Sequence, residues 1–461
     1  MLFNSFEFLA AFLPITLLIY FILLKTKLYR ASRMFLLAAS LFFYGYSNVK
    51  FLLLIIVSIV VNYSVGVLEI KSNSQSLRKF ILIFGIAFNI LLLGYFKYYN
   101  FTLSNVNRLL GMNYNLKNII LPVGISFFTF QQLSYIIDCY RKELNGCSFF
   151  DYGLLVSFFP KILSGPLVSN KDFFAQLQEE KNRNISFNNL SVGLYLLAMG
   201  LGKKVILADY LAVIANKGFN GSAALNFMQG WTTSLSYTLQ LYFDFSGYCD
   251  MAFGIALMFN IVLPQNFDSP YKAKSIKEFW NRWHITLGSF LTKYVYIPLG
   301  GNRKGIVKTC RNLFITFFIS GLWHGSGWNF ILWGMMHGTA MIVHRLTTGK
   351  GLKMNKYIAW LITFIFVNAA WVFFRATDVN AAFVVLKAMV IPDSSIFSIL
   401  SYVNPIWLLL LILFSCLKLK NSNLRAEGFK PNVYTAAFTV ACIVIAMINL
   451  NKNSNFVYFS F

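Results

Sequence analysis

Histidine is rare in this chain of 461 residues and occurs only at positions 284, 324, 337 and 344. The imidazole has an ordinary pKa of about 6.5, which suits it to accept and return a proton near neutral pH. His324 lies in the segment 321–327, Gly-Leu-Trp-His-Gly-Ser-Gly, between two apolar stretches. Its glycines favour a helix break or a close approach of two backbones. Because ionisable groups at membrane depth are costly and tend to be functional, we expect His324 to carry chemistry; the alternative is a packing histidine bonded to a carbonyl.

The other histidines lie in less specific surroundings. His284 ends the segment 279–284, Phe-Trp-Asn-Arg-Trp-His, where a chemical role and a role as an interfacial anchor are both open. His337 follows His324 by thirteen residues, so on one uninterrupted helix the two side chains would point apart. His344 falls in a predicted loop, which favours a solvated role. None of the histidines has an ordinary metal-ligand spacing and no paired carboxylates accompany them, so we expect no metal site.

Two carboxylates and one glycine-rich segment complete the chemical candidates. Asp244 and Asp250 lie within an apolar run, where a carboxylate either lines a cavity or pairs with a cation such as Arg282 or Arg375. The segment 300–305, Gly-Gly-Asn-Arg-Lys-Gly, has the composition of a phosphate-binding loop. It lacks the terminal Gly-Lys-Ser/Thr and a preceding parallel strand, so we predict a tight basic turn there.

The composition limits the elements that can position these residues. The chain is 57% hydrophobic and 12% charged, whereas soluble domains carry about 25% charged residues. A soluble enzyme, a disordered protein and a fibrous protein are therefore excluded, and an all-α multi-pass membrane protein is predicted. The net charge of +24 indicates membrane orientation and attraction to anionic headgroups, and it is not taken as a sign of nucleic-acid binding.

Apolar runs predict 11 to 13 transmembrane helices. We expect the first run to be a membrane helix and no cleavable signal peptide, and basic residues after the first and third runs place the amino terminus outside. The run 231–260 is too long for one simple helix. No internal repeat or separate soluble domain is evident. The runs lie near residues 8–24, 34–46, 51–68, 80–96, 119–137, 152–168, 190–215, 231–260, 312–322, 328–343, 357–374, 404–417 and 433–450.

The segment 264–311 departs from this pattern because lysine and arginine crowd it. Trp280 and Trp283 are three residues apart and share one helical face. Such a stretch lies at the membrane interface or enters the membrane as a re-entrant element that lines a cavity. We therefore expect the middle of the chain to be its working region.

Several short blocks, taken in order, resemble the membrane-bound O-acyltransferase family, and within it the bacterial alginate O-acetylase type, which acetylates exported polysaccharides. Each block alone is weak, whereas their order and spacing are specific. The blocks are Leu121–Phe128, Ser134–Asp138, Phe159-Pro160, Ser164–Pro166, Gln240–Asp250, Asn266-Phe267, Pro270-Tyr271, Glu278–His284, Tyr296–Arg303 and Gly321–Gly325.

The resemblance implies one membrane domain over residues 1–461 with helices around a central cavity and a catalytic core at about 120–345. It assigns the catalytic histidine to His324 and a second catalytic position to His284. Asn281 departs from the branch, which often has arginine there, and this puts a local charge contact in doubt. The candidate residues for the cavity or for substrate binding are Asp244, Asp250, Arg282, Trp323, Asn302 and Arg303.

The resemblance also bears on the carboxyl end, 456–461, which reads Phe-Val-Tyr-Phe-Ser-Phe. Some bacterial acyl-transfer systems of this kind end in a similar Phe-x-Tyr-x-x-Phe sequence whose tyrosine is thought to carry the acyl group. Tyr458 is thus a candidate acyl carrier, and an aromatic anchor in the membrane interface is the alternative.

The implied reaction moves an acetyl group from a cytoplasmic donor, acetyl-CoA, to a hydroxyl, with no bound cofactor. His324 acts as general base, and the basic cluster 272–311 attracts the CoA phosphates. We expect an extracytoplasmic esterase-like acetyltransferase as partner, a polysaccharide acceptor and a location in the bacterial cytoplasmic membrane. Two alternatives remain: transfer of D-alanine or another acyl group to teichoic acid or peptidoglycan, and a transporter without chemistry.

Overall fold

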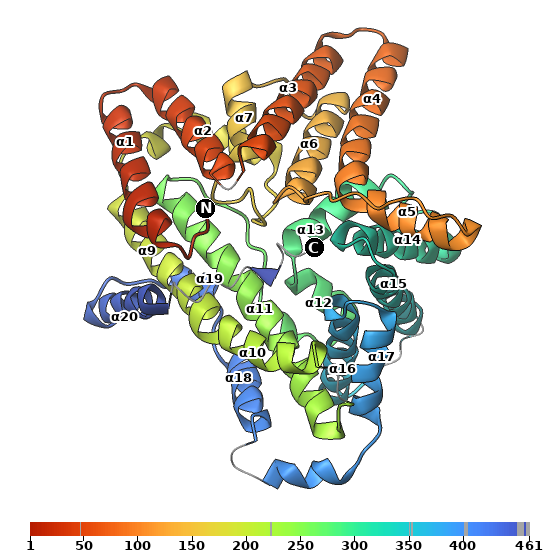
Figure 1. Ribbon diagram of the computed structural model, residues 1–461. Coiled ribbons are helices and arrows are strands. Elements are labelled where there is room, and N and C mark those ends of the chain that lie inside the picture. The colour runs from red at the N-terminus through yellow and green to blue at the C-terminus, as the bar shows by residue number, and fades with distance from the viewer. Residues whose placement is uncertain are drawn as a thin grey trace. The chain divides into compact units, whose positions relative to one another are not determined.

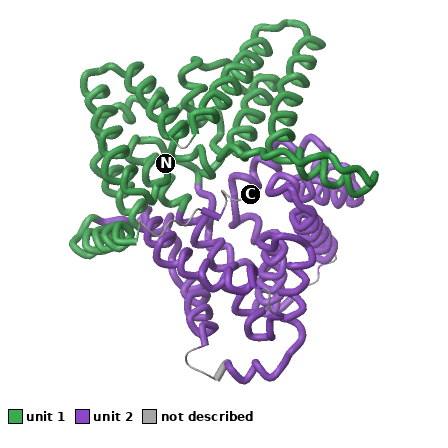
Figure 2. The backbone as a smooth tube through the Cα atoms, in the orientation of Figure 1, with its two compact units in different colours: residues 1–198, 248–264, 431–453 green, residues 199–247, 265–430, 454–461 purple. Residues whose placement is uncertain are grey.

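The computed structural model describes residues 1–46, 48–221, 224–349, 351, 354–400, 404–449 and 456–457. Within these ranges the regular secondary structure is helical (Figure 1), apart from one isolated antiparallel bridge between Phe267 and Trp283. The predicted all-α fold is confirmed. The chain divides into two compact units (Figure 2), and two of the boundaries between them fall inside helices α9 (Phe187–Leu201) and α11 (Phe227–Met258).

Unit 1 comprises residues 1–198, 248–264 and 431–453. Within it α1 packs on α2, α2 packs on α7, and α3 and α4 both pack on α6. Its helices besides parts of α9 and α11 are η1 (Glu7–Phe12), α1 (Leu13–Lys25), α2 (Tyr29–Gly45), α3 (Val49–Lys71), α4 (Gln75–Leu93), η2 (Gly94–Tyr98), α5 (Tyr99–Leu110), α6 (Ile125–Tyr140), α7 (Phe149–Ser157), α8 (Asn170–Gln178), η3 (Glu180–Arg183) and α20 (Val433–Asn449).

Unit 2 comprises residues 199–247, 265–430 and 454–461 and contains all four histidines. Its most extensive helix pair is α14 with α15. Its helices besides parts of α9 and α11 are η4 (Gly202–Ala208), α10 (Asp209–Phe219), η5 (Pro270–Lys272), α12 (Ile276–Arg282), α13 (Ile285–Leu291), η6 (Thr292–Tyr296), α14 (Ile306–His324), α15 (Trp328–Gly349), α16 (Lys356–Arg375), α17 (Val379–Val390), η7 (Ser394–Leu400), α18 (Ile406–Lys418) and α19 (Ser422–Glu427).

Five helical stretches in the described residues are long and apolar enough to cross a membrane, which agrees with a multi-pass membrane protein. Several of the thirteen predicted runs instead fall on shorter apolar helices such as α18 and α20, or on longer helices such as α14 and α15 that are not among the candidate spans. The five candidate spans are Glu7–Lys25, Val49–Lys71, Gln75–Leu110, Phe187–Phe219 and Lys356–Arg375.

Three expectations about single elements are wrong. The run 231–260 forms one continuous helix of 32 residues, α11, since nothing in its sequence breaks the helix. The run 152–168 is helical only to Ser157, where the chain leaves the helix ahead of Pro160. The predicted loop around His344 is the last part of α15.

The basic middle segment folds into short helices with clear starts. Ser275 caps α12 by accepting a hydrogen bond from the Glu278 backbone N–H, which satisfies one of the free donors of the first turn. The helix ends at Arg282, and the chain turns through His284, whose φ is +47°, before α13 begins. This turn places His284 at a helix junction and not within a helix.

Candidate active site

His324 is the last residue of α14, and the helix break predicted from the glycines lies directly after it. The chain reverses through Gly325–Gly327 and returns as α15, so the two helices form a tight hairpin. A Cβ atom on Gly321 would stand 2.5 Å from the Phe330 carbonyl oxygen and 3.0 Å from the Gly334 Cα atom. The predicted close approach of two backbones is therefore confirmed, and glycine at 321 is what allows it.

Aromatic rings surround His324, which is 4% exposed. The centroid of its imidazole lies 4.8 Å from Trp323, 4.9 Å from Trp333 and 5.1 Å from Phe374, each in an edge-to-face arrangement. Such contacts are specific in geometry. They fix the plane of the imidazole and exclude bulk water from around it.

His284 is held by a polar network around one side chain. Its Nδ1 lies 3.2 Å from Asn266 Oδ1, and the same oxygen accepts hydrogen bonds from the backbone N–H and the hydroxyl of Thr286, at 3.1 and 3.0 Å. A backbone N–H can only donate, so this Asn266 atom is the amide oxygen and His284 Nδ1 carries the proton. The lone pair of the neutral ring is then on Nε2. His284 lies outside the five candidate spans, and burial lowers its pKa to about 3, which keeps it neutral.

The two histidines contact the same indole. The Trp323 ring centroid is 6.1 Å from that of His284 and 4.8 Å from that of His324. Phe245 of α11 packs edge-on against His284 at 4.8 Å. The two catalytic positions assigned from the sequence, forty residues apart, are thus neighbours around Trp323.

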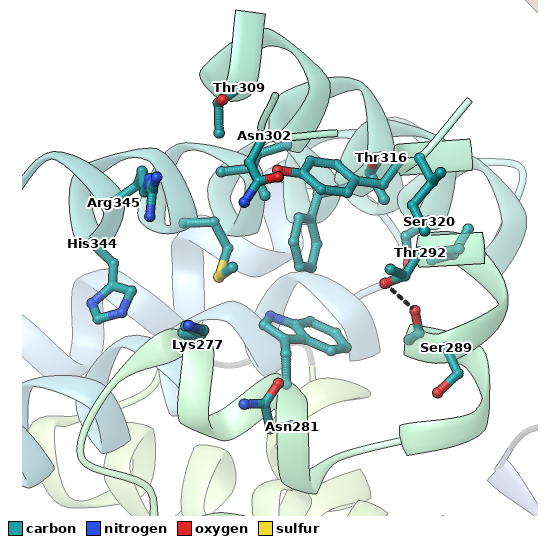
Figure 3. A pocket seen from close by; sticks show the side chains of 18 of the residues that line it. Lys277, Asn281, Ser289, Thr292, Asn302, Thr309, Thr316, Ser320, His344 and Arg345 are labelled. Atoms are coloured by element: carbon teal, nitrogen blue, oxygen red, sulfur yellow. Dashed lines mark hydrogen bonds between the residues drawn. The ribbon is translucent and has the colours of Figure 1, made fainter. Parts of the chain in front are cut away.

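A cavity of about 930 Å³ opens beside this cluster in unit 2. Figure 3 shows Lys277, His344 and Arg345 gathered on one side of it and the hydroxyls of Ser289, Thr292 and Ser320 on the other. The cavity thus combines cationic groups with hydrogen-bonding groups, as an anionic polar ligand requires. The lining residues include neither His324 nor His284.

Two tryptophan rings lie between the cavity and His324. Trp280 lines the cavity, and its centroid is 5.8 Å from that of Trp333, which contacts His324. The Trp280 indole N–H also donates to His337 Nδ1 at 3.3 Å. His337 is fully buried, and its ring lies 4.7 Å from Trp333. The geometry expected for one uninterrupted helix does not apply to His324 and His337, because the hairpin at Gly325 places them on two helices, from which both rings contact Trp333.

The candidate carboxylates and arginine have different surroundings from those expected. Asp244 pairs with the ammonium of Lys204 at 2.7 Å, a cation that sequence reasoning missed, and not with Arg282 or Arg375. Arg282 instead pairs with Asp268 at 3.1 Å and Glu278 at 3.0 Å.

The two remaining residues of this group are Asp250 and Arg375. Asp250 is buried in the part of α11 that belongs to unit 1. Arg375 donates to Asn216 Oδ1 at 2.8 Å.

The remaining candidates are Asn302 and Arg303 in the segment 300–305 and Tyr458 in the carboxyl-terminal segment 456–461. Gly300 and Gly301 have φ of +109° and +55°, which confirms the tight basic turn. Asn302 lines the cavity, whereas Arg303 is exposed beside it and is not among the lining residues. Tyr458 lies outside the described residues. In the described part of the chain, no three histidine, cysteine or acidic side chains gather as metal ligands.

Sequence reasoning missed the residues that hold the two histidines. Asn266 stood within a matching block, and its adjacency to Phe267 gave no sign that it binds His284. Trp333 and His337 lie on the next helix, and their packing on His324 follows from the hairpin. Only the glycines at 321, 325 and 334 could have indicated this close helix pair from the sequence.

The family model described as membrane-bound O-acyltransferase matches residues 92–381, more than half of the chain. That range contains α6 through α16 and therefore both histidines of the cluster around Trp323.

Named relatives extend the match over the whole chain. The chain is 41% identical to a peptidoglycan O-acetyltransferase of Helicobacter pylori, over 100% of this chain and 98% of that protein. It is 40% identical to a probable alginate O-acetylase, AlgI, of Pseudomonas aeruginosa, over 84% and 75% of the two chains. A teichoic acid D-alanyltransferase of Bacillus subtilis is 28% identical over 53% of this chain and 63% of that protein.

Proposed function

Since this chain belongs to the membrane-bound O-acyltransferase family, we propose that it transfers an acetyl group from acetyl-CoA toward a polysaccharide outside the cytoplasmic membrane. The observation that carries this proposal is the pair of buried histidines around Trp323. A hydroxyl is a poor nucleophile at neutral pH, so its attack on a thioester needs a base that removes the proton as the bond forms.

In the proposed reaction His324 is that base. The hydroxyl oxygen attacks the thioester carbonyl carbon while His324 accepts the hydroxyl proton. The tetrahedral intermediate then collapses, the carbon–sulfur bond breaks, and the proton on His324 neutralises the departing CoA thiolate. Proton transfer of this kind contributes about 10²–10⁴-fold to the rate.

His284 has a complementary role in this scheme. Its Nδ1 proton is committed to Asn266, so the lone pair on Nε2 can only accept a hydrogen bond. We assign it the orientation of the acyl donor, through a hydrogen bond that Nε2 accepts from an amide N–H of the CoA pantetheine arm, because the single proton of the hydroxyl goes to His324. Stabilisation of the oxyanion then falls to N–H donors, for which the backbone amides in the bend 325–327 are the candidates.

The cavity supports acetyl-CoA as the donor. Lys277, Lys293 and Arg345 line it, and three cationic side chains suit the phosphates of CoA. In this account Tyr458 receives the acetyl group first, and an esterase-like partner outside the membrane passes it to the glycan. Among acceptors, peptidoglycan is supported by the relative that matches the full length of this chain.

The test is glycan acetylation in cells that carry His324→Ala in place of the native protein. We expect base-releasable acetate on the purified cell-wall glycan to fall to background, with the protein at its normal abundance in the membrane. Normal acetate on the glycan at equal abundance would contradict the role of His324. A loss of D-alanine from teichoic acid, with acetate unchanged, would favour the D-alanyl alternative.

A further inference from the structure

A buried cluster of three charged side chains in unit 2 lies outside the aromatic site. The Lys204 ammonium pairs with Asp244 Oδ1 at 2.7 Å and with Asp209 Oδ1 at 2.9 Å. The side chains of Lys204 and Asp244 are each 2% exposed, whereas that of Asp209 is 21% exposed. We call these three residues the Lys204 triad.

The triad is unbalanced in charge. One ammonium faces two carboxylates, which leaves a formal excess of one negative charge, most deeply buried at Asp244. A buried carboxylate is stable only where donors satisfy its oxygens. Lys204 takes Oδ1 of Asp244, so the second oxygen requires a donor from elsewhere in the chain.

That donor comes from the carboxyl end of the chain. The backbone N–H of Val457 donates to Asp244 Oδ2 at 2.9 Å. The preceding residue, Phe456, is 1% exposed, and the Lys204 ammonium lies 4.7 Å from the centroid of its ring. The tail therefore meets both charges of the ion pair, through a charge-assisted hydrogen bond and a desolvated cation–π contact.

The triad is also close in the chain to the catalytic cluster. Asp244 is followed in α11 by Phe245, whose ring packs on His284 at 4.8 Å. In the tail, Val457 is followed by Tyr458. The contacts of residues 456–457 with Asp244 and Lys204 thus hold the chain directly before the proposed acyl carrier. The hydrogen bond to Asp244 attaches it to α11, the helix whose Phe245 packs on His284.

We propose that the Lys204 triad is the docking site of the chain's own carboxyl-terminal segment and positions Tyr458 for acyl transfer. The second half of this statement rests on the proposed function, whereas the docking itself does not. Asp244 and Lys204 act as positioning residues, since they hold the backbone that leads to the carrier.

The first test removes the hydrogen bond from the tail side, where the fold of the membrane helices is not disturbed. Val457→Pro deletes the backbone N–H, and Val457→Ala keeps it while it shortens the side chain. The full-length proteins are treated with a carboxypeptidase in detergent, and the loss of residues 458–461 is followed by intact mass. We expect release from Val457→Pro to be at least about tenfold faster than from Val457→Ala, the effect of losing one hydrogen bond to a charged group. Equal rates would overturn the docking site.

A double-mutant cycle identifies the partner of that N–H. Asp244→Leu removes the acceptor and leaves Lys204 paired with Asp209. If the two groups bind each other, Val457→Pro adds no further acceleration in the Asp244→Leu background. A full additional acceleration there would show that the Val457 N–H binds elsewhere and would overturn the assignment.

Neither measurement uses an acyl donor, so docking and acyl transfer are tested separately. The radiolabel that the protein takes up from acetyl-CoA is then compared between Val457→Pro and Val457→Ala. A loss of label in intact Val457→Pro, but not in Val457→Ala, supports positioning of Tyr458. Full labelling of Val457→Pro, despite its faster cleavage by the carboxypeptidase, would overturn the positioning role while the docking result stands.

Discussion

At the scale of single residues, the proposed mechanism gives separate tasks to two histidines. His324 lies among aromatic rings, and His284 is oriented by the amide of Asn266. The glycines beside His324 and the family resemblance identified both histidines from the sequence. The tautomer of His284 could not be predicted, because it depends on an amide oxygen eighteen residues away in the chain.

The tautomer argument predicts the effect of Asn266→Ala. Without the amide oxygen, the Nδ1 proton of His284 loses its acceptor, and the ring can rotate or change tautomer. We expect kcat for CoA release from acetyl-CoA to fall by about tenfold or more, in proportion to one buried hydrogen bond, with a smaller change in KM. Thr286→Val is the control, because it removes only one donor to the same oxygen and should have the weaker effect. A kcat for Asn266→Ala equal to that of Thr286→Val would argue against an orienting role.

At the scale of elements, the hairpin of α14 and α15 builds the site. Hydropathy located both helices, and glycine located the break between them. The contacts across the hairpin could not be predicted, since rotation of one helix by a single residue would exchange the side chains that face His324. The expected angle between His324 and His337 applied to one continuous helix, whereas the chain reverses at Gly325.

The close backbone approach predicts that Gly321→Ala is destabilising. The new methyl group would meet the Phe330 carbonyl and the backbone of Gly334, and overpacking of this kind costs about 1–3 kcal/mol. We expect a lower thermal unfolding midpoint in detergent and reduced acetyl transfer. Gly349→Ala, in the same helix pair, has no atom within 4 Å of its new methyl group and should leave the midpoint unchanged or slightly raised. Equal midpoints for the two variants would show that the hairpin tolerates separation.

At the scale of the whole molecule, composition was sufficient to predict an all-helical membrane protein. The number of spans was harder to predict from the sequence. Apolar helices such as α17 and α18 are too short to be clear spans and too apolar to be typical of soluble proteins. Charge alone could not indicate that Lys204 meets Asp244 and the tail, since these residues are distant in the chain. Buried ion pairs of this type depend on the assembled fold.

The proposed path of the acyl group through the molecule predicts the effect of Tyr458→Phe. Phenylalanine keeps the ring and removes the hydroxyl that would accept the acetyl group. We expect no stable label on the protein from radiolabelled acetyl-CoA, with unchanged membrane abundance. Label at the native level would reduce Tyr458 to an interfacial anchor.

The most direct test of the central claim is a single-turnover measurement with His324→Asn. The purified protein is mixed with less than one equivalent of radiolabelled acetyl-CoA, and the release of CoA is followed in time. Asparagine keeps a polar side chain of similar size and cannot act as a base. The account predicts CoA release at least about 100-fold slower than in the native protein, with an unchanged unfolding midpoint. Release at the native rate from the folded variant would contradict His324 as the base that drives acyl transfer.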